Sequence, residues 1–136
     1  MPWAQGLVAL VALGAMLLYF FMGARVGAAR GKYKVEAPAT TGDPIFERTF
    51  RVHQNTLEQM VPFLVGLYFF DTTLSALGAA ALGVVWILGR IIYMQAYIAN
   101  PKSRAPGMLL TVGATAILVM GGIIGVVLRV IRDLPH

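Results

Sequence analysis

Four long apolar runs, separated by shorter polar segments, dominate the pattern of the chain. They cover about 4–24, 45–71, 74–98 and 106–129. An α-helix needs about 20 apolar residues to cross the hydrocarbon core of a bilayer, and each run is at least that long. The pattern therefore predicts an all-α membrane protein, a four-transmembrane-helix bundle that forms a single domain over residues 1–136.

Charged and turn-forming residues mark where the runs begin and end. No Lys or Arg precedes the first run, which favours a retained helix over a signal peptide. The segment 24–47 is predicted as the long loop, and Asp43-Pro44 is predicted to supply the N-cap and first position of the second helix. Pro101 and Pro106 bracket the loop that ends the third run.

Composition supports a membrane protein and excludes several other classes. Hydrophobic residues make up 58% of the chain and charged residues 12%, against about 45–50% and about 25% in soluble domains. The chain has no cysteine, so disulfides, thiolate metal sites and cysteine nucleophiles are excluded, and any thiol chemistry has to arrive with a substrate. The net charge of +5 is better explained by topology than by nucleic-acid binding, because no basic helix stands clear of the apolar runs.

The distribution of basic residues predicts the orientation in the membrane. Four bases lie in 24–47 and two in 99–105, whereas the opposite side has only Arg129 and Arg132. The positive-inside rule places both basic loops in the cytoplasm and both termini on the other side. The Ala/Gly-rich, cysteine-free composition favours a bacterial inner membrane.

The second run carries a stripe of unusual residues. At about 100° per residue, five side chains share an arc about 80° wide; this polar stripe consists of Arg48, Arg51, Asn55, Glu58 and Pro62. Glu58 lies about 10 Å deeper than Arg51 along the helix, and each such charge costs about 2.5–3.5 kcal/mol on insertion scales. The polar stripe is therefore expected to face other helices, a partner charge or a polar ligand.

A second stripe lies on the third run, made of Gly83, Trp86, Arg90, Tyr93 and Tyr97. The polar groups of the two stripes have two possible interpretations. In one, Glu58 forms a purely structural salt bridge with one of the nearby arginines, which are Arg48, Arg51 and Arg90. In the other, these arginines and Arg104 outnumber the single Glu58 and bind an anionic ligand.

His53 falls near 200° on the second run, off the polar stripe. It is either a polar residue at the membrane interface or a residue that faces a second subunit.

The spacing of the polar stripe resembles the signature of a known family. Residues 46–63 read E-R-x-x-R-x-x-x-N-x-x-E-x-x-x-P from Glu47 onward, which resembles the MAPEG family, the membrane-associated proteins of eicosanoid and glutathione metabolism. The paired tyrosines of the third run and Arg104-Ala-Pro-Gly agree with leukotriene C synthase and microsomal glutathione transferase members. The resemblance covers essentially the whole chain.

The resemblance implies a homotrimer that binds glutathione between neighbouring subunits, near the cytoplasmic side. It implies an integral membrane glutathione transferase for a lipophilic electrophile, with peroxidase activity on lipid hydroperoxides as a second expected activity and a role in detoxification; no metal is expected. Arg104 is implied to stabilise the thiolate. The glutathione-binding residues are predicted to be Arg30, Arg48, Arg51, His53, Asn55, Glu58, Arg90, Tyr93 and Tyr97. Of these, Arg30 and His53 are implied to reach in from the adjacent subunit.

Two departures from the family pattern keep other functions open. Gln59 stands where leukotriene C synthase members tend to have an aromatic residue, and the basic pair near the end of the first helix is reduced to Arg30-Gly31. The alternatives are a non-catalytic lipid-binding scaffold of the same fold and a small transporter that uses Glu58 as an ion relay.

Overall fold

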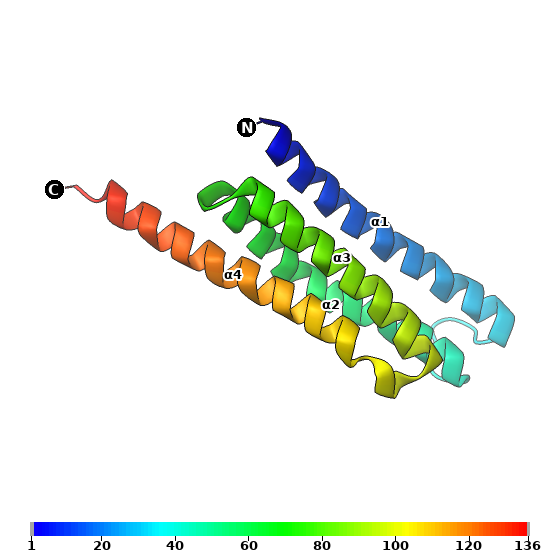
Figure 1. Ribbon diagram of the computed structural model, residues 1–136. Coiled ribbons are helices and arrows are strands. Elements are labelled where there is room, and N and C mark those ends of the chain that lie inside the picture. Colours follow the sequence, from blue (N-terminus) through cyan, green and yellow to red (C-terminus); the bar gives the residue numbers. More distant parts are fainter. Residues whose placement is uncertain (1, 136) are drawn as a thin grey trace.

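The computed structural model describes residues 2–135 and consists of long α-helices joined by short connections (Figure 1). The elements are α1 (Pro2–Tyr33), α2 (Pro44–Thr73), α3 (Ala76–Ala99), the 3₁₀ turn η1 (Pro101–Ser103) and α4 (Ala105–Asp133). The all-α bundle of four long helices is therefore confirmed.

The two middle helices of the chain form the centre of the bundle. α2 and α3 pack against each other and each contacts both α1 and α4, whereas α1 and α4 lie on opposite sides of this pair (Figure 1). Successive helices run antiparallel, so both chain termini lie at one end. The α1–α2 loop and η1 lie together at the other end, and the predicted basic loops therefore share one end of the molecule.

Three segments are long and apolar enough to cross a membrane: Pro2–Tyr33, Ala76–Ala99 and Pro101–Asp133. Large apolar side chains cover their outer surfaces; Leu17 on α1 is 68% exposed and Leu109 on α4 is 72% exposed. Side chains of this kind are stable in contact with lipid, and the chain is a membrane protein. α2 has 30 residues but is more polar, because the polar stripe occupies its first half; its crossing of the membrane stays a prediction.

The connection between α1 and α2 is shorter than the sequence pattern predicted. The predicted loop over 24–47 is wrong for 24–33, which continue α1, and for 44–47, which begin α2. Ala and Arg are strong helix formers, so charge alone did not end the helix. It ends where Lys34 takes a left-handed conformation with φ 56°, and the Val35 amide then donates to the Arg30 carbonyl at 3.1 Å, a common helix-ending motif.

The predicted start of the second helix is confirmed in detail. Asp43 is the N-cap of α2, and its Oδ1 accepts hydrogen bonds from the amides of Ile45 at 2.8 Å and Phe46 at 3.0 Å. Pro44 follows it at the first helical position, where its missing N–H costs no hydrogen bond. This cap fixes where α2 begins and therefore sets the position of the polar stripe.

Aromatic stacking and close helix crossings hold the centre together. Phe63 of α2 and Trp86 of α3 stack with ring centroids 4.1 Å apart and planes 10° from parallel. α4 crosses α3 at Gly107, where a Cβ would meet the Tyr93 backbone nitrogen and lie 2.8 Å from the Gly89 carbonyl oxygen. Glycine at this position lets α4 begin directly against the part of α3 that carries Tyr93.

We therefore predict that Gly107→Ala destabilises the bundle. The added methyl has only backbone to displace, so the free energy of unfolding should fall by about 1–3 kcal/mol. Thermal unfolding in detergent, followed by circular dichroism, measures the change. Gly113→Ala on the same helix is the matched control, because a Cβ there meets nothing within 4 Å. Equal unfolding temperatures for the two variants would show that α3 and α4 have room for a methyl group at Gly107.

Candidate functional site

The candidate site lies on α2, α3 and the start of α4, toward the end of the bundle that holds η1. Arg48 joins two of these elements. Its Nη1 donates to the carbonyl oxygens of Ile98 at 3.3 Å and Ala99 at 3.4 Å, at the C-terminus of α3. A cation is stabilised there by the helix dipole and the free carbonyls. Arg48 therefore fixes α2 against the end of α3.

Arg51 and Glu58 form an ion pair two helical turns apart on α2. Arg51 Nη1 lies 3.1 Å from Glu58 Oε1, and Nη2 lies 3.4 Å from Oε2. Both side chains are about half exposed, at 50% and 51%. The structure thus contains one of the ion pairs that the structural interpretation requires. An exposed pair of this kind contributes only about 0–1 kcal/mol in water, so its two charges can be exchanged for those of a ligand.

Arg90 lies inside the protomer and is fully buried. Its Nη2 donates to Thr56 Oγ1 at 2.8 Å, and its guanidinium lies 4.3 Å from the centroid of the Tyr93 ring. Its Nε and Nη1 have no hydrogen-bond partner within residues 2–135. Arg90 and the buried residues of the second stripe therefore point into the helix bundle, whereas the Arg51–Glu58 pair is half exposed.

Thr56 is the residue that the sequence pattern missed. Its hydroxyl donates to the Val52 carbonyl at 2.7 Å and accepts from Arg90, and the residue is fully buried. Thr56 falls outside the polar stripe, and a single threonine in an apolar run carries little signal. Only the buried arginine on another helix reveals its role.

The two tyrosines extend from Arg90 toward the end of α3. Tyr93 is buried and stacks on Tyr97, with ring centroids 5.4 Å apart and planes 25° from parallel. The Arg90 guanidinium lies 4.3 Å from the Tyr93 ring centroid, and the start of α4 packs on the Tyr93 backbone at Gly107. Groups from α3 and α4 therefore meet at this tyrosine.

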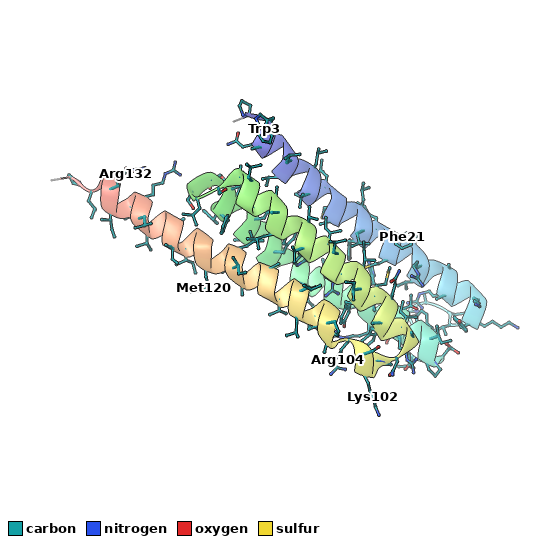
Figure 2. All side chains as sticks on the ribbon, viewed as in Figure 1. Trp3, Phe21, Lys102, Arg104, Met120 and Arg132 are labelled. Atoms are coloured by element: carbon teal, nitrogen blue, oxygen red, sulfur yellow. The ribbon has the colours of Figure 1, made fainter. Side chains whose placement is uncertain are left out.

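Asn55 and Arg104 differ in how exposed they are. Asn55 is buried, and its Oδ1 has no hydrogen-bond partner in the described part of the chain. Arg104 is exposed at the bend between η1 and α4 (Figure 2), where its Nη1 donates to the Pro101 carbonyl at 3.4 Å. Such a weak contact leaves most of the Arg104 guanidinium available to another partner.

The two residues that the resemblance assigns to a neighbouring subunit make contacts within their own chain. Arg30 Nη1 donates to the Ala39 carbonyl at 2.7 Å, and its guanidinium lies 4.8 Å from the Phe46 ring centroid. His53 stacks on Tyr19 of α1, with centroids 4.4 Å apart. Both residues therefore help to attach α1 to α2, and their contribution to another subunit stays a prediction.

The assembled groups suit a small molecule that carries both signs of charge. Arginine and tyrosine donors can bind carboxylates, and one carboxylate, Glu58, can bind an ammonium group. Within residues 2–135, no three His, Cys, Asp or Glu side chains are close enough to hold a metal ion. The fold and site together define a helical membrane protein with an arginine- and tyrosine-lined site near one end.

Comparisons with known proteins identify the family. The MAPEG family profile matches residues 8–124, and the chain belongs to that family. An uncharacterized protein of Synechocystis is 43% identical over 118 residues, covering 87% of this chain and 86% of the relative. Human microsomal glutathione S-transferase 2 is 37% identical over 120 residues, covering 88% and 82%. Bovine leukotriene C4 synthase is 34% identical over 119 residues, covering 83% and 75%. The family assignment made from the polar stripe is confirmed.

The Arg90–Thr56 hydrogen bond predicts an asymmetry between two buried threonines. Thr56→Val keeps the side-chain shape but leaves Arg90 Nη2 without its acceptor, so stability should fall by about 1–3 kcal/mol. Thr115→Val is the matched control, because Thr115 Oγ1 has no hydrogen-bond partner in the described chain. Removing this hydroxyl should leave the free energy of unfolding unchanged or raise it slightly. Thermal unfolding of both variants in detergent tests this. An equal loss of stability in Thr56→Val and Thr115→Val would contradict a structural role for the Arg90–Thr56 hydrogen bond.

Proposed function

We propose that this protein is an integral membrane glutathione transferase that joins the thiolate of glutathione to a lipophilic electrophile. The observation that carries the proposal is the half-exposed Arg51–Glu58 pair on the polar stripe of α2, in a chain of the MAPEG family. The names of the human and bovine relatives support the same chemistry.

The charges of glutathione match the groups on α2. Glutathione has two carboxylates, an α-ammonium group and a thiol. Arg51 is placed to bind a carboxylate, and Glu58 is the acid on the polar stripe for the ammonium group. The bond between them opens as each side chain takes a charge of opposite sign from the ligand, so the binding site loses no ion pair overall. Asn55 is the third proposed ligand group on α2, because its Oδ1 has no hydrogen-bond partner within residues 2–135.

The reaction requires the thiol as its anion. A free thiol has a pKa near 8.5, and only the thiolate is a good nucleophile. Arg104 supplies the positive charge: a lowering of the thiol pKa by about two units corresponds to about 2.7 kcal/mol of preferential thiolate stabilisation. The thiol proton passes to water. The sulfur then attacks the electrophilic carbon, the S–C bond forms, and the electron pair of the breaking bond leaves with the departing atom.

The same site also suits reduction of a lipid hydroperoxide. There the first thiolate attacks the distal peroxide oxygen and releases the lipid alcohol after protonation. A second glutathione displaces water from the oxidised sulfur and forms the disulfide. In both reactions a water-soluble thiol reacts with a substrate dissolved in the bilayer, which suits a site in a membrane protein.

The proposal includes a homotrimer with glutathione between subunits. Half-exposed charges on α2, in a bundle whose outer surface carries many large apolar side chains, need cover from lipid, and a neighbouring subunit with bound ligand provides it. Arg30 and His53 of the neighbour would then add to the site. The proposal also puts this site at the cytoplasmic face of a bacterial inner membrane, with both termini on the other side; the basic residues of the two loops support that orientation.

The direct test is Arg104→Ala in detergent-solubilised protein. We expect turnover with a lipophilic electrophile to fall by about 10²-fold, the size of effect seen when one electrostatic group is removed from the developing charge. Glutathione affinity should change much less, and thiolate absorbance at neutral pH should fall. Lys102→Ala removes an exposed base from the same loop and should leave all three quantities unchanged.

Other outcomes would point elsewhere. Failure of the wild type to bind glutathione at millimolar concentration would refute the proposal. Unchanged turnover in Arg104→Ala would reduce Arg104 to a loop residue. Glutathione binding without conjugation of any electrophile would favour the lipid-binding scaffold, and ion transport that depends on Glu58 in liposomes would favour the transporter.

A further inference from the structure

A cavity of about 200 Å³ lies at the loop end of the bundle, between the last turns of α1, the start of α2 and the end of α3. Four polar side chains line it, namely Arg25, Lys32 and Tyr33 of α1 and Thr49 of α2. The α1 residues that line it between the two cations are alanines, which leave space for a ligand. The cavity therefore offers two positive charges and two hydroxyl groups.

Arg25 and Lys32 have few partners within the protein. Arg25 Nη1 donates to Met94 Sδ at 3.5 Å, and a thioether sulfur is a weak acceptor. Neither cation forms an ion pair within residues 2–135. Arg48, at the same end, instead donates to two carbonyl oxygens at the C-terminus of α3. The donors of Arg25 and Lys32 are thus available to an anion.

The cavity lies where α1 leaves the apolar part of the membrane. Residues 2–24 carry no charged side chain, and Arg25 is the first charged residue of the chain. This uncharged segment rises about 33 Å, and the hydrocarbon core of a bilayer is about 30 Å thick. Lys32 lies about 10 Å farther along the helix. The side chains of Arg25 and Lys32 therefore bracket the layer in which lipid phosphates lie.

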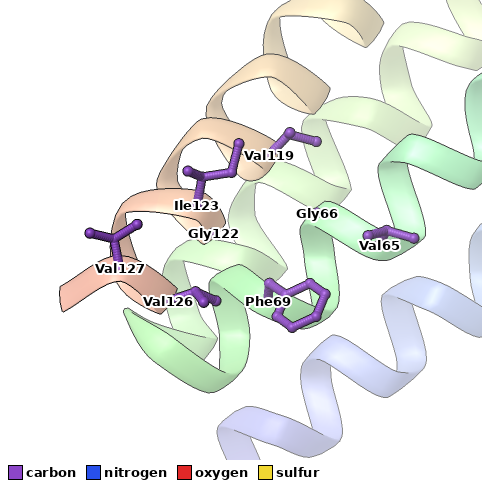
Figure 3. A pocket seen from close by; sticks show the side chains of 8 residues that line it. All are labelled: Val65, Gly66, Phe69, Val119, Gly122, Ile123, Val126 and Val127. Carbon is purple, nitrogen blue, oxygen red and sulfur yellow. The ribbon is translucent and has the colours of Figure 1, made fainter. Parts of the chain in front are cut away.

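The cavity lies on a different face of the bundle from the proposed subunit contact. The apolar groove between α2 and α4 in Figure 3 is on the face of α2 that carries Arg51, so a subunit that covers the polar stripe also covers that groove. Thr49 lies about 160° around α2 from Arg51. Arg25 lies about 140° around α1 from Arg30, the α1 residue that the proposed trimer uses. Covering the polar stripe therefore does not require covering this cavity.

We propose that this cavity binds the phosphate of one anionic phospholipid between Arg25 and Lys32. Cations and hydroxyl groups suit phosphate oxygens, and basic pockets between membrane helices bind anionic lipid headgroups in other proteins. The acyl chains then lie along the apolar part of α1. Two unpaired cations favour a headgroup with a net negative charge over phosphatidylcholine, whose choline group repels them. The site is independent of the thiol chemistry, because none of the predicted glutathione-binding residues lines it.

Native mass spectrometry of the detergent-solubilised protein, titrated with one lipid at a time, tests the proposal. Each Lys or Arg beside an anionic lipid favours its binding by about fivefold. We therefore expect the first phosphatidylglycerol per chain to bind about 25-fold more tightly than the first phosphatidylcholine. Glycerol phosphate carries the phosphate without acyl chains and should bind much more weakly than phosphatidylglycerol.

Substitutions at the two cations locate the preference. Arg25→Gln and Lys32→Gln should each reduce it to about fivefold, and the double variant should bind both lipids equally. Arg25→Lys retains the charge and should retain the preference. Lys102→Gln removes the same charge from η1, at the same end of the bundle but outside the cavity, and should also retain it.

Three results would overturn the proposal. Equal binding of both lipids by the wild type would leave only ordinary boundary lipid. An undiminished preference in the double variant would place the anionic lipid elsewhere on the protein. Glycerol phosphate that binds as tightly as phosphatidylglycerol would make the cavity a site for small soluble anions.

Discussion

A guanidinium group inside an apolar helix bundle is the constraint on which the centre of this protein depends. Arg90 is fully buried and donates to Thr56 across the α2–α3 contact. An unpaired charge in a membrane interior is costly, so the helices that supply its partners have to stay together. The Arg90 guanidinium also lies against Tyr93, whose backbone packs against Gly107 at the start of α4. One buried contact thus links three helices where the candidate site begins.

The cost of an unpaired charge also explains why other arginines bond to the protein itself. Arg48 is bonded to the end of α3, and Arg30 is bonded to the loop after α1. These arginines fasten elements to one another, whereas Arg51, Glu58 and Arg104 remain accessible. Some charged side chains thus have a structural role, and others are available to a ligand. Residue type alone does not tell the two groups apart.

Sequence periodicity predicted the helices, turn chemistry predicted the Asp43 cap, and the resemblance of residues 46–63 to a known signature indicated the family, because each depends on residues close together in the chain. It failed where the outcome depends on three-dimensional packing. α1 continues through its charged residues to Tyr33, since arginine and alanine favour a helix and polarity does not end one. The angular position of Arg90 gave its face of the helix but not its depth in the bundle. Thr56 was missed because its role exists only through Arg90. Sequence could not decide whether Glu58 pairs with an arginine of its own chain or with a ligand.

Calorimetric titration of the detergent-solubilised protein with glutathione tests most directly whether the charges on α2 bind this ligand. The wild type should bind glutathione, and Glu58→Gln should weaken binding by about 10-fold or more, since it removes a charged hydrogen bond worth about 1.5–3 kcal/mol. Glu36→Gln, in the exposed loop, should bind as the wild type does. Equal affinities for the wild type and Glu58→Gln would show that Glu58 does not bind glutathione and would leave the Arg51–Glu58 pair as a structural salt bridge.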